Sequence, residues 1–192
     1  MLNATQSLPP PVTYQKPRFA MPRGACDSHT HVIPQTGWTL VAEANYTPVP
    51  APAPVHLAML SFLGLERGVV VQPSIFGTDN TAVVDAIARA PERLRGVAVV
   101  DPSISDAGLQ ALHAQGIRGV RFNVMLGGGG GLKAMTELAS RLASLGWHAE
   151  ILVDGHLLPD LLPALKALPC RRVIDHMASL RADIGLDAMP TR

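Results

Sequence analysis

The sequence predicts a parallel α/β fold in which strands and helices alternate along the chain. Three observations support this prediction. Short β-branched runs recur, most of them are apolar on consecutive positions, and a longer helical pattern lies between each run and the next. Strand–helix repetition of this kind builds a parallel sheet with right-handed crossovers. The chain has 192 residues, 47% apolar and 16% charged, which is enough for a domain with a sizeable core.

Each element has a definite place in the sequence. The predicted strands are residues 25–29, 68–73, 96–101, 119–124, 149–154 and 171–176. The predicted helices are residues 54–65, 78–90, 105–116, 132–146 and 158–169. The third helix has clear ends, because Ser105 can cap its first turn and Gly116 can stop it. Residues 1–23 hold five prolines and little periodicity. They are predicted to form an N-terminal arm, which leaves 24–192 as the α/β domain.

The number of strands and the placement of polar residues favour different versions of this fold. Six strands fit an open doubly wound sheet, since a closed (β/α)₈ barrel needs eight strands and typically about 250 residues. However, no GxGxxG motif follows the first strand, and polar residues stand at the ends of most strands. They are His29, His31, Gln72, Ser74, Asp101, Arg121, Asn123, Asp154 and His176. A barrel distributes its site over many strand ends in this way, so their distribution favours a barrel.

Composition limits the partners that we expect. The formal net charge of +1 gives no reason to expect nucleic acid or an acidic membrane surface. No run of about 18 apolar residues is present, so no membrane span is expected. Cys26 and Cys170 form no CxxC motif, which fits free thiols in a reducing compartment. The N-terminus lacks the apolar core of a signal peptide. The sequence thus predicts a cytoplasmic protein whose partner is a small molecule.

A pair of histidines follows the first short apolar run. His29 and His31 are two residues apart, so on a strand they point to the same face. Neutral imidazoles placed in this way could bind zinc, given a third ligand and a water. They could equally donate protons to a carbonyl oxygen and polarise it. His176 ends the last predicted strand, and from the residues alone it fits a core histidine as well as a site residue.

Several blocks of the sequence, in this order, resemble the amidohydrolase superfamily. They are "CDSHTHV", "VVQPSIFGTDN", "RGVAVVDPSISDAGLQALHAQGIRGVRFN", "LGWHAEI" and "RVIDHMASLRADIGLD". Within the superfamily they are similar to the branch of 2-pyrone-4,6-dicarboxylate lactonase-like hydrolases. The resemblance covers roughly residues 24–187. It implies a (β/α)₈ barrel, of which this chain has about six strands and five helices, and a hydrolase that opens a lactone by attack of water.

The resemblance also implies roles for particular residues. Three histidines are expected to face one pocket and to be catalytic: His29, His31 and His176. Tyr46, Ser74 and Arg121 are expected to bind the substrate, and the planar guanidinium of Arg121 would clamp a carboxylate. Without the resemblance, loop scaffolding is the better interpretation of Tyr46 and Ser74, and a surface-facing salt bridge fits Arg121 equally well.

No cofactor is expected, because the lactonase branch works without a metal and the fourth predicted strand ends in "RFN", with no lysine. The alternative is one divalent ion such as zinc, held by His29, His31 and His176, in a metal-dependent hydrolase or decarboxylase. His148 precedes the fifth predicted strand. It is therefore expected at the bottom of the barrel in a structural role.

The sequence departs from the dicarboxylate lactonases in two places. Residues 126–132 hold five consecutive glycines and are predicted to form a mobile lid over the site. The resemblance implies a second basic residue near this loop, and an arginine where Ser179 stands. Both departures favour a lactone with fewer carboxylates.

The resemblance further implies a catalytic base on the last strand of the barrel, for which no residue here is a match. Loss of a positioned base costs a factor of about 10²–10⁴. We therefore expect weak or no activity from this chain alone, and turnover at rates typical of the family would contradict that expectation. A non-catalytic fragment is a further alternative. The open edges of an incomplete sheet could also pair with a second copy of the chain.

Overall fold

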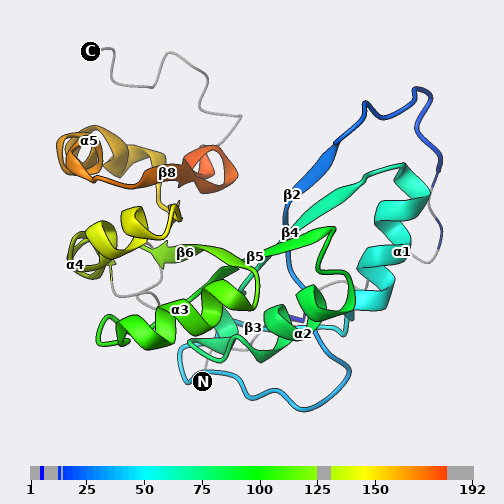
Figure 1. Cartoon of the computed structure of the whole chain (residues 1–192), viewed down its shortest axis with the longest axis horizontal. Helices are drawn as coiled ribbons and strands as arrows, with labels where there is room; N and C mark the ends of the chain where they lie inside the picture. Colours follow the sequence, from blue (N-terminus) through cyan, green and yellow to red (C-terminus); the bar gives the residue numbers. More distant parts are fainter. Residues whose placement is uncertain (1–4, 7–12, 14, 125–130, 181–192) are drawn as a thin grey trace.

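The computed structural model describes residues 5–6, 13, 15–124 and 131–180 (Figure 1). In these residues one parallel sheet has its strands in chain order: β2 (Cys26–Thr30), β4 (Arg67–Val71), β5 (Leu94–Ala98), β6 (Ile117–Asn123), β7 (His148–Leu152) and β8 (Arg171–Ile174). A doubly wound sheet reverses its strand order at one point, and this sheet does not. The winding is therefore that of a (β/α) barrel, and the alternative of an open doubly wound sheet is wrong.

Five helices connect these strands, as predicted, and lie along the outside of the curved sheet (Figure 1). They are α1 (Ala53–Leu63), α2 (Thr81–Arg89), α3 (Asp106–Ala114), α4 (Gly131–Ser144) and α5 (Leu158–Ala167). Their ends follow local chemistry. Ser105 caps α3 by accepting a hydrogen bond from the backbone N–H of Gly108. Helix α2 starts later than predicted, and Asp79 accepts a hydrogen bond from the backbone N–H of Thr81 there.

The two faces of the sheet differ in chemistry. Val120 and Phe122 of β6 and Ile151 of β7 face the helices and belong to the main hydrophobic core. Their neighbours Arg121 and Glu150 point to the opposite face and are also buried. These strands are thus buried on both faces, as their consecutive apolar positions indicate, but β6 and β7 place charged side chains on the inner one, because side chains alternate along a strand. This polar inner face carries the candidate site.

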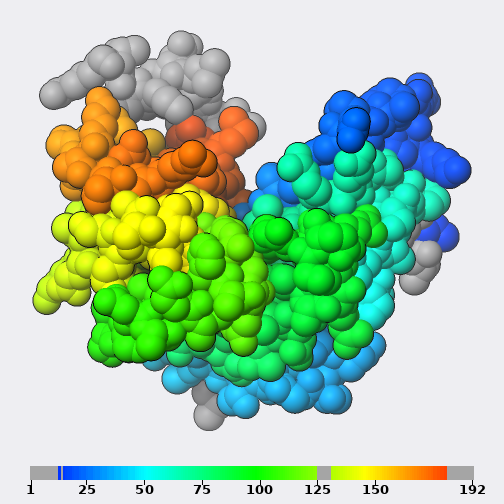
Figure 2. Space-filling model, in the orientation of Figure 1, coloured from blue at the N-terminus to red at the C-terminus, as the bar shows by residue number. Residues whose placement is uncertain are grey.

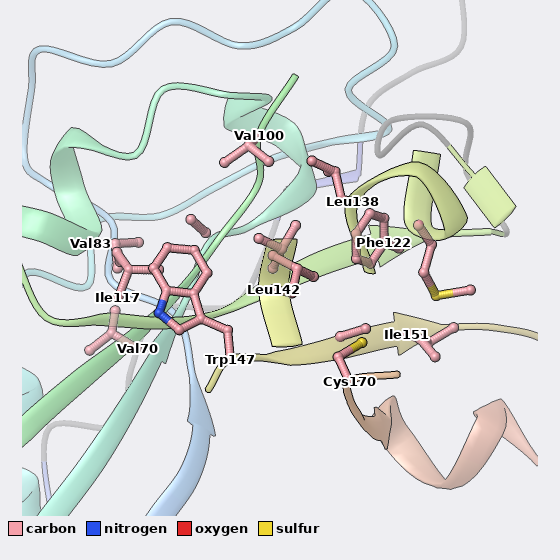
Figure 3. Close-up of a cluster of buried hydrophobic side chains, with 14 of the residues drawn as sticks. Val70, Val83, Val100, Ile117, Phe122, Leu138, Leu142, Trp147, Ile151 and Cys170 are labelled. Carbon is pink, nitrogen blue, oxygen red and sulfur yellow. The ribbon is translucent and has the colours of Figure 1, made fainter. Parts of the chain in front are cut away.

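The main core lies between the sheet and the helices (Figure 3). Trp147 is 1% exposed and packs among residues of α4 and the strands, Leu142 and Ile117 among them. Its Nε1–H donates to Nδ1 of His113 over 2.9 Å, so the one polar atom of its side chain has a partner. The core therefore joins α3 and α4 to the sheet and holds the strands that carry the site.

A short ladder involves the predicted N-terminal arm. Strand β1 (Thr5–Gln6) pairs in parallel with β3 (Tyr46–Thr47), on the segment between β2 and α1. The division at residue 23 remains a prediction. Most of the glycine run, residues 126–130, lies outside the described residues, and so does the predicted lid. In the part of the chain that the structure describes, no helix is long and apolar enough to cross a membrane.

We predict that Leu142→Ala lowers the free energy of unfolding by about 2–5 kcal/mol, because Leu142 is fully buried and its truncation leaves a cavity. Urea unfolding followed by circular dichroism measures the loss. Leu162→Ala is the matched control, since Leu162 lies on α5 with 39% of its surface exposed. Equal losses in the two variants would contradict the assignment of the core.

Candidate active site

The three predicted histidines come together at the carboxyl ends of β2 and β8. His29 lies in β2, His31 follows directly after it, and His176 follows β8. The ring centre of His29 is 5.1 Å from that of His31 and 4.8 Å from that of His176. The surface is hollowed between the orange segment around β8 and the blue segment around β2 (Figure 2). The cluster therefore joins the two edge strands of the described sheet.

A left-handed turn places His176. Strand β8 ends at Ile174, so His176 stands beyond the strand rather than at its end as predicted. His176, Met177, Ala178 and Ser179 all have positive φ, between 49° and 58°. Residues with side chains avoid this region, at a cost of about 1–3 kcal/mol each. Such strain is concentrated at functional sites, and here it carries an exposed imidazole to the cluster.

The hydrogen bond of His31 decides which of its nitrogens can act. Nδ1 lies 2.7 Å from the carbonyl oxygen of Val71. A carbonyl only accepts, so Nδ1 carries the hydrogen and Nε2 has a free lone pair. Burial lowers the pKa of His31 from 6.5 to about 4, so the ring is neutral near pH 7. The predicted catalytic role of His31 stays a prediction, and in this tautomer its free nitrogen would accept a hydrogen bond rather than donate one to a carbonyl oxygen. Its Nε2 is an acceptor or a metal ligand.

Arg121 is paired inside the protein. It is 4% exposed, and its Nε–H donates to Oδ2 of Asp175 over 2.9 Å. One terminal nitrogen also donates to the carbonyl oxygen of Gln72 over 3.4 Å. An arginine in a strand is costly unless it is paired, and Asp175 supplies that partner. The predicted role of Arg121 as a substrate clamp stays a prediction, with part of its guanidinium already engaged.

Glu150 is a residue of the site that sequence reasoning missed. Its side chain is 3% exposed, and its Oε1 lies 3.4 Å from Nδ1 of His29 and 3.8 Å from Nε of Arg121. Burial raises the pKa of Glu150 above its usual value, and the nearby carboxylate of Asp175 acts in the same direction. The available signal was a single carboxylate inside the apolar run "AEILVD". It lies opposite Arg121 in the register of β6 and β7.

The other predicted substrate-binding residues lie on segments that follow β2 and β4. Ser74 opens a short 3₁₀ turn after β4, and its Oγ accepts a hydrogen bond from Asn123 of β6 over 3.3 Å. Tyr46 is half-buried in β3. Burial raises its pKa, and the positive charge of Arg121 acts in the opposite direction. The positive charge of Arg121 thus acts electrostatically on the hydroxyl group of Tyr46. Substrate contacts by Tyr46 and Ser74 remain predictions.

A metal ion would find a different donor set from the predicted one. Among the described residues, His29, Asp175 and His176 could hold an ion, with ligand atoms within 4.8 Å of one another. Asp175 thus stands where the sequence suggested His31. Imidazole and carboxylate are donors that zinc accepts. Nε2 of His29 and Oδ1 of Asp175 are buried without a hydrogen-bond partner among the described residues, so the set fits a divalent ion.

His148 is the first residue of β7, as predicted for the bottom of the barrel. Its Nε2 lies 3.8 Å from Oε2 of Glu150, the carboxylate oxygen that does not face His29. His148 therefore reaches the site through Glu150.

The part-barrel winding and the polar cluster inside it define a class of protein. A family model described as "Amidohydrolase" matches residues 26–191, and the chain belongs to this family.

Particular relatives refine this assignment. The chain is 42% identical to a 2-pyrone-4,6-dicarbaxylate hydrolase of Comamonas testosteroni, over 90% of this chain and 58% of that protein. It is 35% identical to a 4-sulfomuconolactone hydrolase of Rhizobium radiobacter, over 99% of this chain and 67% of that protein. A crystal structure of a probable 2-pyrone-4,6-dicarboxylic acid hydrolase from Acinetobacter baumannii, with citric acid bound, superposes with a TM-score of 0.72. The two sequences are 34% identical, and the match covers 80% of this chain and 58% of that one. The chain thus spans less than two thirds of the first relative.

We predict that stability falls as the pH drops from about 6.5 to about 4, and that His31→Gln removes part of this fall. In that window the unfolded chain binds a proton on His31 that the folded chain does not, because burial lowers the pKa of the folded form to about 4. The linked loss is about 3 kcal/mol at the acid end. Urea unfolding at a series of pH values measures it.

The matched control for this experiment is His156→Gln, because the side chain of His156 is exposed. The His156 variant should follow the wild type across the whole pH range. A His31 variant with an unchanged pH dependence would show that His31 is not buried as a neutral ring.

We predict that Arg121→Met destabilises the fold by about 3–5 kcal/mol, because it leaves the buried carboxylate of Asp175 without its ionic partner. Thermal and urea unfolding measure the effect. Arg89→Met, at an exposed position of α2, should change stability by no more than about 0.5 kcal/mol. Similar effects of both variants would contradict a buried ion pair.

Proposed function

We propose that this protein is a lactone hydrolase whose site is the histidine cluster, and that its substrate is a small cyclic ester bearing a carboxylate. One observation carries the proposal: the rings of His29, His31 and His176 converge at the carboxyl ends of the two edge strands. Support comes from the relatives named as 2-pyrone-4,6-dicarbaxylate and 4-sulfomuconolactone hydrolases, which belong to the same family.

Hydrolysis of a lactone requires a water made nucleophilic and a carbonyl that is polarised. The lone pair on Nε2 of His31 can accept a hydrogen bond from the attacking water. His176 is exposed at the rim, where a ring N–H can donate to the carbonyl oxygen of the substrate. Tyr46 and Ser74 would orient the ring, and the guanidinium of Arg121 would face the substrate carboxylate.

We propose a substrate with fewer carboxylates than a pyrone dicarboxylate. Arg121 already shares its charge with Asp175, so it has less to offer a second anion. Ser179, at the end of the left-handed turn, adds no positive charge. These two positions together favour a lactone with a single carboxylate.

We propose that the reaction proceeds without a metal. The positive charge of Arg121 lies 2.9 Å from Asp175 and opposes a cation at that carboxylate. The alternative is a metal-dependent hydrolase or decarboxylase of the same family. In that case His29, Asp175 and His176 would hold one divalent ion, which would supply Lewis-acid polarisation. Metal content of the purified protein separates the two, and one zinc or manganese per chain would favour the alternative.

We further propose a cytoplasmic protein that self-associates. Cys26 and Cys170 are both free thiols. Within the described residues β2 and β8 each have an unpaired edge, and Val173 of β8 is 44% exposed. Such edges favour pairing with another chain. The alternative hypothesis, that the chain is a non-catalytic fragment, predicts that it binds no lactone.

The test is binding and turnover of a panel of lactones with one carboxylate, two carboxylates or none. We expect saturable binding by calorimetry, tightest for the monocarboxylates, and slow release of acid in a pH-stat. His176→Ala should lower turnover about 10-fold or more, because it removes one group that acts on the carbonyl. His156→Ala is the exposed control and should change neither quantity. Folded protein that neither binds nor hydrolyses any of these lactones would overturn the proposal.

A further inference from the structure

The segments that lead into five of the strands form a basic end of the molecule. They are residues 64–67, 90–95, 115–118, 145–148 and 168–172, and together they hold six arginines and two glutamates. The strands are parallel, so these segments meet at the amino-terminal edge of the sheet, at the opposite end from the histidine cluster. Because the formal net charge of the chain is only +1, positive charge is concentrated at this end.

Three of these arginines are held in the same way. Each is the second residue of its strand, and its Nη1 donates to a backbone carbonyl oxygen four or five residues earlier. They are Arg95 of β5, Arg118 of β6 and Arg172 of β8. In Arg95 and Arg118, Nη1 also donates to the carbonyl oxygen of the preceding residue. These bonds satisfy carbonyl groups at or near the ends of helices, and they fix the guanidinium groups in place.

The other donors of Arg95 and Arg118 have no partner in the part of the chain that the structure describes. No acceptor there is bonded to Nε–H or Nη2–H of either side chain, and no carboxylate there forms an ion pair with them. Arg95 is exposed and Arg118 is half-buried. Each guanidinium thus keeps its charge, its Nε–H and its Nη2–H available to a ligand.

Arg93 is a contrasting case at the same end of the sheet. Its Nε, Nη1 and Nη2 all donate to residues 61–66, which end α1 and lead into β4. Arg93 therefore joins two segments of the chain and is fully used in that structural role. Helix capping explains Nη1 of Arg95 and Arg118, but it leaves the rest of these two groups unexplained.

Arg95 and Arg118 lie on neighbouring strands. Gly96, which follows Arg95, pairs with Ile117, which precedes Arg118, and paired strands are roughly 5 Å apart. Burial lowers the pKa of Arg118, and the positive charge of Arg95 acts in the same direction. Like charges placed in this way repel each other, and a bound anion would relieve the repulsion.

We propose that Arg95 and Arg118 form a binding site for a phosphate group at the amino-terminal end of the sheet. Nε–H and Nη2–H of a guanidinium form a fork of two parallel donors, which suits the oxygens of a phosphate. The two forks together carry two positive charges. A phosphate monoester carries about −1.5 to −2 charges at pH 7 and three acceptor oxygens, so it matches both forks, whereas a carboxylate balances only one. This site is separate from the histidine cluster and does not depend on the proposed lactone hydrolysis.

The first test is calorimetric titration at low ionic strength with two probes, inorganic phosphate and phenyl phosphate. We expect saturable binding of at least one probe to the wild type. Tighter binding of inorganic phosphate would identify the free anion as the ligand, and tighter binding of phenyl phosphate would identify a phosphate ester. Folded wild-type protein that binds neither probe at millimolar concentration would overturn the proposal.

The second test separates a built site from a diffuse positive field. Arg95→Gln should weaken binding about 10-fold or more, and Arg118→Lys about 5-fold, because an ammonium keeps the charge but cannot form two parallel bonds. Arg89→Gln is the matched control, since Arg89 is exposed at the end of α2 and its loss removes the same charge near the same end. It should change the affinity by less than about 2-fold. Equal losses in Arg95→Gln and Arg89→Gln would overturn the proposal.

Circular dichroism shows whether each variant is folded before the titration. Arg95 is exposed, so Arg95→Gln is expected to fold. If Arg118→Lys does not fold, the comparison of Arg95→Gln with Arg89→Gln still decides between a site and a field. A rise in the melting temperature with phosphate, present in the wild type and reduced in Arg95→Gln, is an independent readout of the same binding.

The third test locates the bound phosphate. His176 lies beyond the carboxyl end of β8, at the other end of the sheet, so His176→Ala should bind the better probe with unchanged affinity. A loss of binding in His176→Ala would place the phosphate at the histidine cluster and overturn the proposal. Phosphate binding in a protein that hydrolyses no lactone would refute the proposed function and leave the site of Arg95 and Arg118 intact.

Discussion

The buried ion pair between Arg121 and Asp175 is the interaction on which the inner face of the sheet depends. It links β6 to the turn after β8, and it lies beside Glu150 and His29. A lone guanidinium or carboxylate at this depth would be very costly. With the pair in place, the same Asp175 can present its second oxygen to His29. Charge balance inside the barrel and the orientation of the site are therefore set by the same contact.

The outer face of the sheet is stabilised mainly by apolar packing, which places few demands on the identity of each residue. Apolar side chains such as Val120 and Ile151 pack against helices, and any residue of about the right size and polarity would serve. The inner face cannot be built in that way, because each polar atom needs a particular partner. This difference explains why the unpartnered atoms of His29, Glu150 and Asp175 gather on one face. A substrate, a water or an ion bound at this face could supply the partners that these atoms lack.

The strand and helix order could be predicted from the sequence, because periodicity and helix caps are local signals. The convergence of His29 and His176 was predicted only through resemblance to a family. The pairing of Arg121 was beyond local reasoning, since its partner lies 54 residues away. Glu150 left one weak signal, a carboxylate in an apolar run. The open doubly wound alternative was excluded by the strand order, which no single segment contains.

What the sequence alone determined is the alternation of elements and the common face of His29 and His31, because a strand places every second side chain on the same side. Only the tertiary structure decided which nitrogen of His31 is available, because its Nδ1 donates to the backbone carbonyl of Val71 on the neighbouring strand. It also decided which groups face His29, since Glu150 and Asp175 reach it from β7 and from the turn after β8. The physical reason is that the position of a proton depends on the atoms facing it, and the curvature of the sheet chooses those atoms.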